Sequence, residues 1–194
     1  MINKIELKKI LRDYNYLYET LHDIKEISAD AETKFRDAMI KSGDNEALSA
    51  LIPDEKDSKK IEEVKASEES PISHNDIDFK KLFRKIVVKC HPDKNREANS
   101  SELSLFKECY ENANVANETY DWGLLIRTAN KLDMDFSDLN ISISEIKRKN
   151  EELQSEINRY ENSMAFQWYT QDDEMQKENF LNYCLGIFRE SRKN

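Results

Sequence analysis

Two apolar runs with heptad spacing, one near each end of the chain, most constrain the fold. In residues 1–27 and again in residues 139–164, the apolar positions recur in alternating steps of three and four. That spacing places them on one face of an α-helix. The positions are Leu7, Ile10, Tyr14, Leu17, Leu21 and Ile24 in the first run, and Leu139, Ile143, Ile146, Asn150, Leu153, Ile157, Tyr160 and Met164 in the second. A narrow apolar face on a long helix needs a partner helix, so the sequence predicts a coiled coil.

Composition extends this expectation to the whole chain. The 194 residues include only three Gly and three Pro, while 36% of them are charged. Few helix breakers and many charges favour long solvated helices, and we therefore predict an all-α fold. The two runs are expected to pair as an antiparallel coiled coil within one chain, with Asn150 in the seam fixing the register. A homodimeric coiled coil is the alternative.

The chain between the runs divides by composition. Residues 53–75 contain almost no large apolar side chains and cannot offset the entropy cost of ordering, so we expect a flexible linker there. A second helix is expected to begin at Ser28 and to stop at Ser42-Gly43. The predicted organisation is an N-terminal helical segment at 1–52, the flexible linker at 53–75, a central helical module at 76–135 and a C-terminal coiled-coil or helical hairpin at 136–194.

The central module is built around the tripeptide His91-Pro92-Asp93. An amphipathic helix precedes it, with Phe79, Leu82, Phe83, Ile86 and Cys90 on one face. Pro92 disfavours helical backbone at His91, so this helix should end there. A polar loop and a second helix should follow, capped by Ser100 or Ser101. The predicted buried positions of that helix are Leu103, Phe106, Cys109, Tyr110, Ala113 and Ala116, and it should end near Gly123.

Charge is distributed unevenly around this tripeptide. The chain carries a formal net charge of −9, yet residues 79–95 hold six Lys or Arg and one Asp. An acidic protein is unsuited to general nucleic-acid binding, which requires a basic surface to neutralise phosphates. A basic island on an acidic protein instead favours an electrostatically steered protein partner.

The stretch KKLFRKIVVKCHPDKN, followed by SELSLFKECYENA, resembles the J domain of DnaJ-type co-chaperones, and the resemblance covers residues 76–135. It implies a J-domain-like hairpin of helices II and III, with the tripeptide at the connecting loop. It also implies docking on the ATPase domain of a DnaK-type heat-shock chaperone and stimulation of its ATP hydrolysis. The docking residues implied by the match are His91, Pro92, Asp93, Phe83, Arg84, Lys85, Lys89, Lys94 and Asn95, and Phe106 matches the core phenylalanine of helix III.

Two features depart from the family. Its usual short helix I, with a Tyr-x-x-Leu pattern, should precede helix II, but the polar segment ending near Pro71 occupies that place. Either helix I is missing or the N-terminal helices fill its packing role. In addition, no Gly/Phe-rich segment or CxxCxGxG zinc repeat follows the module.

The sequence thus predicts a co-chaperone rather than an enzyme, without a cofactor or metal. Its partners would be a chaperone ATPase domain and an unknown client, with no nucleic acid or membrane involved and a homodimer possible. The three cysteines, Cys90, Cys109 and Cys184, lack CxxC spacing, which favours free thiols in a cytoplasmic protein. No apolar run suggests a signal peptide or a membrane span.

Two alternatives remain open at this point. The first is a coiled-coil scaffold or assembly protein with a degenerate J-like hairpin, which stimulation of a chaperone ATPase would distinguish. The second concerns residues 166–169, Phe-Gln-Trp-Tyr. They either fill a hairpin between two helices, which we favour, or form an interface hot spot. A last helix, capped by Asp172 or Asp173, is expected to bury Phe180, Leu181, Cys184, Leu185 and Phe188.

Overall fold

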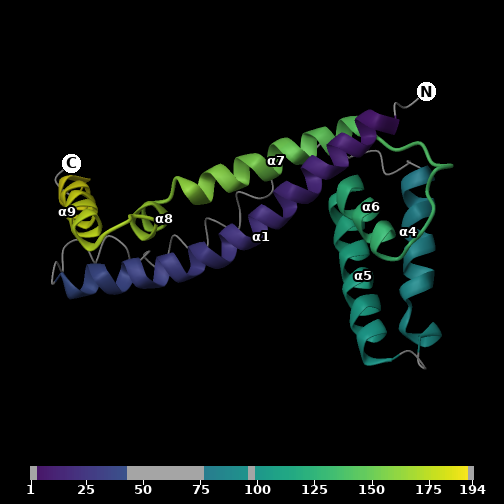
Figure 1. Ribbon diagram of the computed structural model, residues 1–194, viewed down its shortest axis with the longest axis horizontal. Coiled ribbons are helices and arrows are strands. Elements are labelled where there is room, and N and C mark those ends of the chain that lie inside the picture. The colour runs from purple at the N-terminus through teal and green to yellow at the C-terminus, as the bar shows by residue number, and fades with distance from the viewer. Residues whose placement is uncertain (1–3, 43–76, 96–98, 192–194) are drawn as a thin grey trace. The chain divides into compact units, whose positions relative to one another are not determined.

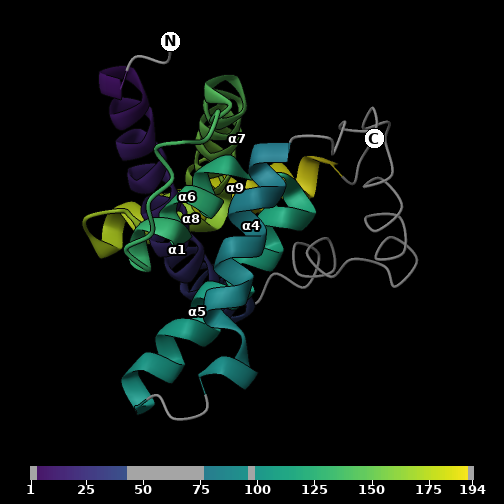
Figure 2. The ribbon, with the colours of Figure 1, turned by 90° about the vertical axis from the view of Figure 1, so that its right-hand side faces the viewer.

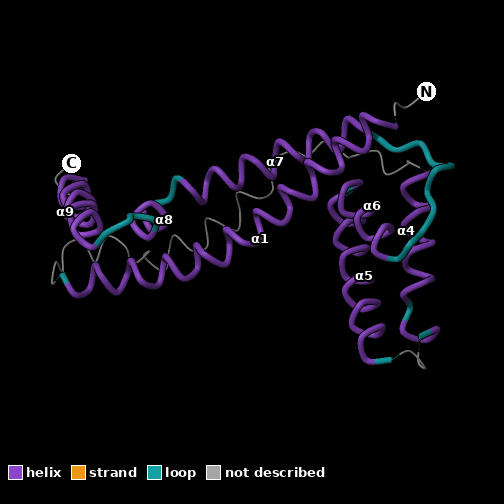
Figure 3. The backbone as a smooth tube through the Cα atoms, in the orientation of Figure 1, coloured by secondary structure: helices purple, strands orange, loops and turns teal. Residues whose placement is uncertain are grey.

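The computed structural model describes residues 4–42, 77–95 and 99–191, and these residues form helices and no strand (Figure 3). The all-α prediction is confirmed for this part of the chain. The linker predicted at residues 53–75 lies outside the described residues. The seven α-helices of the described residues are α1 (Lys4–Lys41), α4 (Ile77–Cys90), α5 (Ser100–Thr119), α6 (Trp122–Lys131), α7 (Ile143–Glu161), α8 (Met164–Tyr169) and α9 (Glu174–Ser191). One 3₁₀ turn, η1 (Pro92–Lys94), follows α4. None of these helices is both long enough and apolar enough to cross a membrane.

The chain forms two compact units, whose boundary falls after Glu19 in α1 and after Gln154 in α7. The first unit contains α1 up to Glu19, the helices α4, α5 and α6, and α7 up to Gln154. The second contains the remainder of α1 and α7 together with α8 and α9. Each unit therefore combines segments that are far apart in the sequence.

Helix α1 is continuous, so the predicted restart at Ser28 is wrong. Ser28 is 2% exposed and occupies the buried face between Ile24 and Ala31. The apolar period continues through it in steps of four and three, and burial of this face outweighs the preference of serine for a helix start. The predicted stop is confirmed, because the helix ends at Lys41 and the Ser42 hydroxyl donates to the Met39 carbonyl at 2.6 Å.

In the first unit, α1 and α7 run parallel, so the predicted antiparallel pairing is wrong (Figure 1). Lys147 pairs with Glu6 at 2.9 Å, and one turn later Asn150 Nδ2 donates to the Ile10 carbonyl at 3.3 Å. Heptad spacing determines which face is buried but not the direction of the partner. The residues between the two helices, 42–142, are numerous enough to bring the start of α7 back to the start of α1.

The core of the first unit lies between α4, α5 and α6, which pack side by side (Figures 1 and 2). The buried face of α4 consists of Phe79, Leu82, Ile86 and Cys90, as predicted apart from the half-buried Phe83. On α5 the buried residues are the small Cys109, Ala113 and Ala116. Small side chains let the two helices of this hairpin approach closely. Leu103 was predicted to be buried but is 42% exposed. It lies in the first turn of α5, beyond the contact between Cys90 and Cys109.

The start of α5 differs from the prediction by one residue. Asn99 caps the helix: its Oδ1 accepts from the Glu102 N–H at 2.9 Å, and the Glu102 carboxylate accepts from the Asn99 N–H at 3.1 Å. This reciprocal pair satisfies two donors that a helix start leaves unpaired, and asparagine is among the best caps. The helix ends at Thr119, followed by Tyr120 in the left-handed region at φ 50°. Gly123, which was expected to end α5, lies in the first turn of α6.

The second unit has its own small core. The second half of α1 contributes Ala31, Phe35 and Met39, and α8 and α9 contribute the rest. Trp168 packs against Phe35 with the ring centroids 5.6 Å apart. Tyr169 donates to Asp30 at 2.8 Å. Residues 166–169 thus cover the core between helices, in agreement with the favoured interpretation. The cap of α9 is Asp173, as predicted, since its Oδ1 accepts from the Gln176 N–H at 2.7 Å.

Candidate functional site

The tripeptide forms a single tight turn directly after α4. Helix α4 ends at Cys90, as Pro92 predicts, and His91 adopts extended backbone at φ −60° and ψ 130°. The Lys94 N–H donates to the His91 carbonyl at 3.0 Å, and the Asn95 N–H donates to the Pro92 carbonyl at 3.2 Å. Because Pro92 fixes its own φ and lacks an N–H, it suits the first position of such a turn.

His91 is held from two sides. Its Nδ1 accepts from the Asp93 N–H at 3.2 Å, and its ring lies edge-on to Tyr110 of α5 with the centroids 6.4 Å apart. An accepting Nδ1 carries no proton, so in the neutral ring the proton is assigned to Nε2, which is then a donor. The carboxylate of Asp93 is 3.7 Å from Nδ1, and its side chain is 68% exposed. The turn therefore presents an acceptor on Asp93 beside a half-exposed imidazole.

Asn95 closes the turn onto the end of α4. Its Nδ2 donates to the Lys89 carbonyl at 2.8 Å and to the His91 carbonyl at 3.0 Å. The last carbonyls of a helix have no partner within the helix, and a side-chain amide can satisfy them. The Asn95 side chain thus stabilises the loop internally, while Lys94 beside it is exposed.

The outward face of α4 forms a shallow basic surface, here called the outer face. It is lined by Ile77, Lys80, Lys81, Arg84, Lys85 and Val88. Two of these are exposed apolar residues, Ile77 at 79% and Val88 at 51%. Four cations between two apolar side chains, on the helix that leads into the turn, make a surface suited to an acidic partner.

One acidic residue lies against this face. Asp138, in the segment after α6, pairs with Lys81 at 2.8 Å and is 3.9 Å from Lys85. The hydrogen bond from Lys81 lowers the pKa of Asp138, and the same bond raises the pKa of Lys81. Lys80 and Arg84 make no ion pair with any residue that the structure describes, so they are the cations most available to a partner.

Lys89 makes an internal contact instead. Its ammonium donates to the Leu132 carbonyl, at the C-terminal end of α6. A cation at that position also interacts favourably with the helix dipole. Lys89 therefore ties α4 to α6, and it does not line the outer face with Arg84 and Lys85.

The structure thus places the predicted site residues in three groups. The turn consists of His91, Pro92, Asp93, Lys94 and Asn95. Arg84 and Lys85 lie on the outer face, with the half-buried Phe83 beside it. Lys89 is apart from both groups and contacts the end of α6. Residues absent from the prediction are Lys80, Lys81, Tyr110 and Asp138. The period of α4 could have indicated the two lysines, because Lys80 and Lys81 stand one turn before Arg84 and Lys85. Nothing local indicates Asp138.

The N-terminal helix braces this module through α6. Tyr14 is fully buried, and its hydroxyl donates to Asp121 Oδ2 at 2.9 Å. The other oxygen of Asp121 accepts from the Leu124 N–H at 2.9 Å and so caps α6. Burial raises the pKa of Asp121 above its usual range, and burial together with this carboxylate raises that of Tyr14. On the α6 surface, Arg127 donates to Asn15 at 3.2 Å.

Comparisons with protein-family models, curated proteins and solved structures find no match to this chain. Within the described residues, no group of three or more His, Cys, Asp or Glu side chains gathers closely enough to hold a metal ion.

Proposed function

We propose that this chain is a co-chaperone that docks on the ATPase domain of a DnaK-type heat-shock chaperone and stimulates ATP hydrolysis there. The observation that carries the proposal is the position of His91-Pro92-Asp93. The tripeptide forms the tight turn at the end of α4, whose outer face is basic, in a hairpin with α5. The resemblance to J domains assigns docking to this combination of turn and basic helix.

In this proposal each part of the surface has a distinct task, which its exposure and charge support. Lys80 and Arg84, exposed and without an ion pair to a described residue, attract an acidic groove on the partner over long range. The exposed Asp93 carboxylate accepts charge-assisted hydrogen bonds from a partner arginine, which are roughly twice as strong as neutral ones. Tyr110 and Asn95 hold the turn in shape, so less ordering entropy is lost on docking.

The test is single-turnover ATP hydrolysis by a DnaK-type chaperone in the presence of the full chain. Asp93→Asn and His91→Gln should each abolish stimulation and leave the circular dichroism spectrum unchanged. Asp133→Asn is the matched control. Asp133 is exposed, lies outside the turn, and has φ 50°, a conformation that asparagine tolerates well. Full stimulation by the Asp93 variant would refute the proposed function.

The parallel pairing of α1 with α7 favours one other candidate, a coiled-coil scaffold or assembly protein whose hairpin has no chaperone partner. The same assay separates the two candidates. A scaffold leaves the chaperone ATPase at its basal rate in the wild-type chain as well as in the Asp93→Asn variant.

A further inference from the structure

The first unit contains a groove that the docking surface does not use. It has a volume of about 910 Å³ and lies between the start of α1 and the segment that joins α6 to α7. A volume of this size is typical of ligand sites. Its apolar lining comprises Leu7 and Leu11 from α1 and Met134, Phe136, Leu139 and Ile141 from the joining segment.

The wall formed by the joining segment is fixed by its own hydrogen bonds. The Met134 N–H donates to the Ala129 carbonyl at 3.0 Å, and the Leu139 N–H donates to the Phe136 carbonyl at 3.1 Å. The Asn140 N–H donates to the Asp78 carboxylate at 3.1 Å, which ties the segment to α4. The opposite wall is a long helix. A groove with two such walls is preformed, so ligand binding loses little conformational entropy in ordering it.

The charges along the groove are distributed asymmetrically. The two carboxylates that line the groove both have partners: Asp138 pairs with Lys81, and Asp135 accepts from the Ser137 N–H at 2.9 Å. On the α1 side, Lys8 and Arg12 are exposed and make no ion pair with any described residue. The α1 edge of the groove therefore attracts anionic groups.

The spacing on α1 indicates what shape of ligand fits. Lys8 and Arg12 are four residues apart, as are Leu7 and Leu11, which corresponds to about 6 Å along a helix. In an extended chain, side chains two residues apart point to the same side and are separated by about 6.6 Å. Acidic residues at alternate positions can thus face the two cations, while the intervening residues face the apolar lining. The guanidinium of Arg12 can also bind a carboxylate through two hydrogen bonds.

We propose that this groove binds an extended, acidic segment of a partner protein in which Glu or Asp alternates with apolar residues. The occupant is distinct from the chaperone ATPase domain, because the cations of the groove are on α1 and those of the proposed docking surface are on α4. The inference does not rest on the proposed function.

The experiment measures fluorescence anisotropy of a short fluorescein-labelled peptide of alternating Glu and Leu, titrated with the full chain and no chaperone. Saturable binding is expected. Arg12→Glu and Lys8→Glu should each weaken it by about tenfold or more, because a charge-assisted contact becomes a repulsion. Lys9→Glu is the matched control. It makes the same charge change one residue away on α1, at an exposed position outside the groove lining, and should alter affinity little.

Two further peptides test the geometry. One has the same composition but carries Glu and Leu in separate blocks, and the other has Lys in place of Glu. Both should bind much more weakly than the alternating peptide. Absence of saturable binding, equal binding of the block peptide, or an equal loss with Lys9→Glu would each overturn the proposal. Circular dichroism of each variant verifies the helix content.

Because the assay omits the chaperone, its failure leaves the ATPase test of the proposed function unaffected. In the same way, loss of ATPase stimulation by Asp93→Asn says nothing about the groove. Each proposal can therefore be refuted without affecting the other.

Discussion

The contact between Tyr14 and Gly123 predicts that the same substitution will have opposite effects at two helical glycines. A methyl group added at Gly123 would lie 2.7 Å from Tyr14 Cζ and closer still to Cε2 and Cδ2. The ring cannot retreat, because Tyr14 is fully buried and its hydroxyl is bonded to Asp121. A methyl group added at Gly186, in α9, would meet nothing within 4 Å. Gly123→Ala should destabilise the protein, and Gly186→Ala should stabilise it.

The magnitude follows from two opposing effects. Replacing a helical glycine by alanine lowers the entropy cost of folding and stabilises a helix by about 0.5–1 kcal/mol. Forcing an extra methyl group into a filled core costs about 1–3 kcal/mol. Only the first effect acts at Gly186, whereas both act at Gly123. The two variants should therefore differ in unfolding free energy by about 1–3 kcal/mol. With a urea dependence of about 2 kcal/mol per molar, this separates their midpoints by roughly 1 M.

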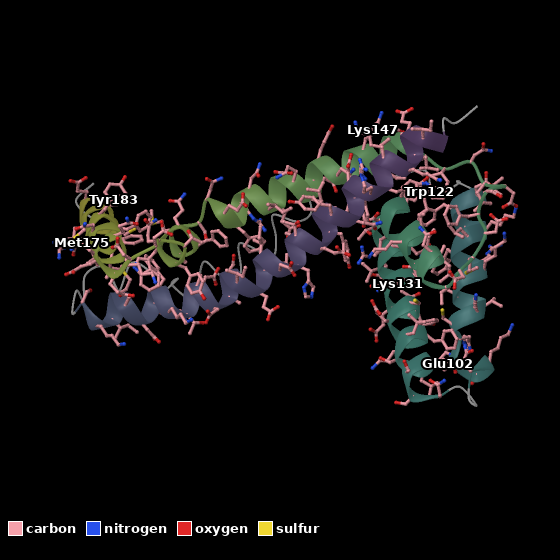
Figure 4. The ribbon with its side chains drawn as sticks, in the orientation of Figure 1. Glu102, Trp122, Lys131, Lys147, Met175 and Tyr183 are labelled. Atoms are coloured by element: carbon pink, nitrogen blue, oxygen red, sulfur yellow. The ribbon has the colours of Figure 1, made fainter. Side chains whose placement is uncertain are left out.

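The assay is equilibrium urea unfolding followed by far-ultraviolet circular dichroism. The chain has two tryptophans, one in each compact unit, so a Trp168→Phe background leaves Trp122 to report the first unit. Trp122 lies at the start of α6 (Figure 4). It is 1% exposed and directly precedes Gly123 in the sequence. If Gly123→Ala raises the midpoint as much as Gly186→Ala does, then Tyr14 does not pack on α6 and the brace is refuted.

Two further predictions concern Asp121 and Asp138. Burial raises the pKa of Asp121 in the folded state, so between the unfolded and folded pKa values the folded state binds more protons and stability falls as pH rises. Asp121→Asn can still accept from the Leu124 N–H but does not titrate, so it lacks this loss of stability with rising pH. The difference between its unfolding midpoint and that of the wild type should therefore increase with pH from about 4 upward. A difference that stays constant with pH would contradict the raised pKa of Asp121. Asp138→Asn removes the partner of Lys81 and leaves the outer face more positive. It should speed association with a DnaK-type chaperone at low ionic strength and lose that advantage at high salt, as measured by stopped-flow fluorescence; an unchanged rate at low salt would argue against docking on this face.

Local patterns predicted most of the helices and several of their ends. Pro92 ended α4, Ser42 followed the end of α1, and Asp173 capped α9, because each acts on its own turn of backbone. The buried face of α4 likewise followed from a period of 3.6 residues, apart from the half-buried Phe83. Local patterns failed at Ser28, where burial of a whole helix face outweighed one residue's preference.

These local patterns could not predict how helices that are distant in the sequence pair with one another. A heptad run is compatible with either direction of its partner helix, so the parallel pairing of α1 with α7 required the structure. The contacts that position the candidate site also join residues that are far apart in the sequence. Lys89 reaches Leu132, and Lys81 reaches Asp138. No motif marks these partners, because an exposed aspartate or a helix-end carbonyl is common in any chain. Pro92 alone predicted a helix end at the tripeptide. A docking role for the tripeptide and its neighbours was predicted only through the resemblance to J domains.

The bracing of α6 bears on the short helix I that the J-domain resemblance implies and that the sequence does not show before α4. The fully buried side chains of α5 are all small, namely Cys109, Ala113 and Ala116. Because small side chains bury little apolar surface, the two-helix hairpin needs a third element to hold its base together. The ring of Phe79 in α4 packs against the rings of Trp122 and Tyr120, with centroid separations of 5.1 Å and 4.7 Å respectively. These contacts link the base of the hairpin to the start of α6. Asp121, between those two aromatic residues, is the acceptor for Tyr14. The first turns of α6 are thus held from one side by the hairpin and from the other by α1. A segment more than a hundred residues upstream of α6 therefore supplies a packing surface at the base of the hairpin.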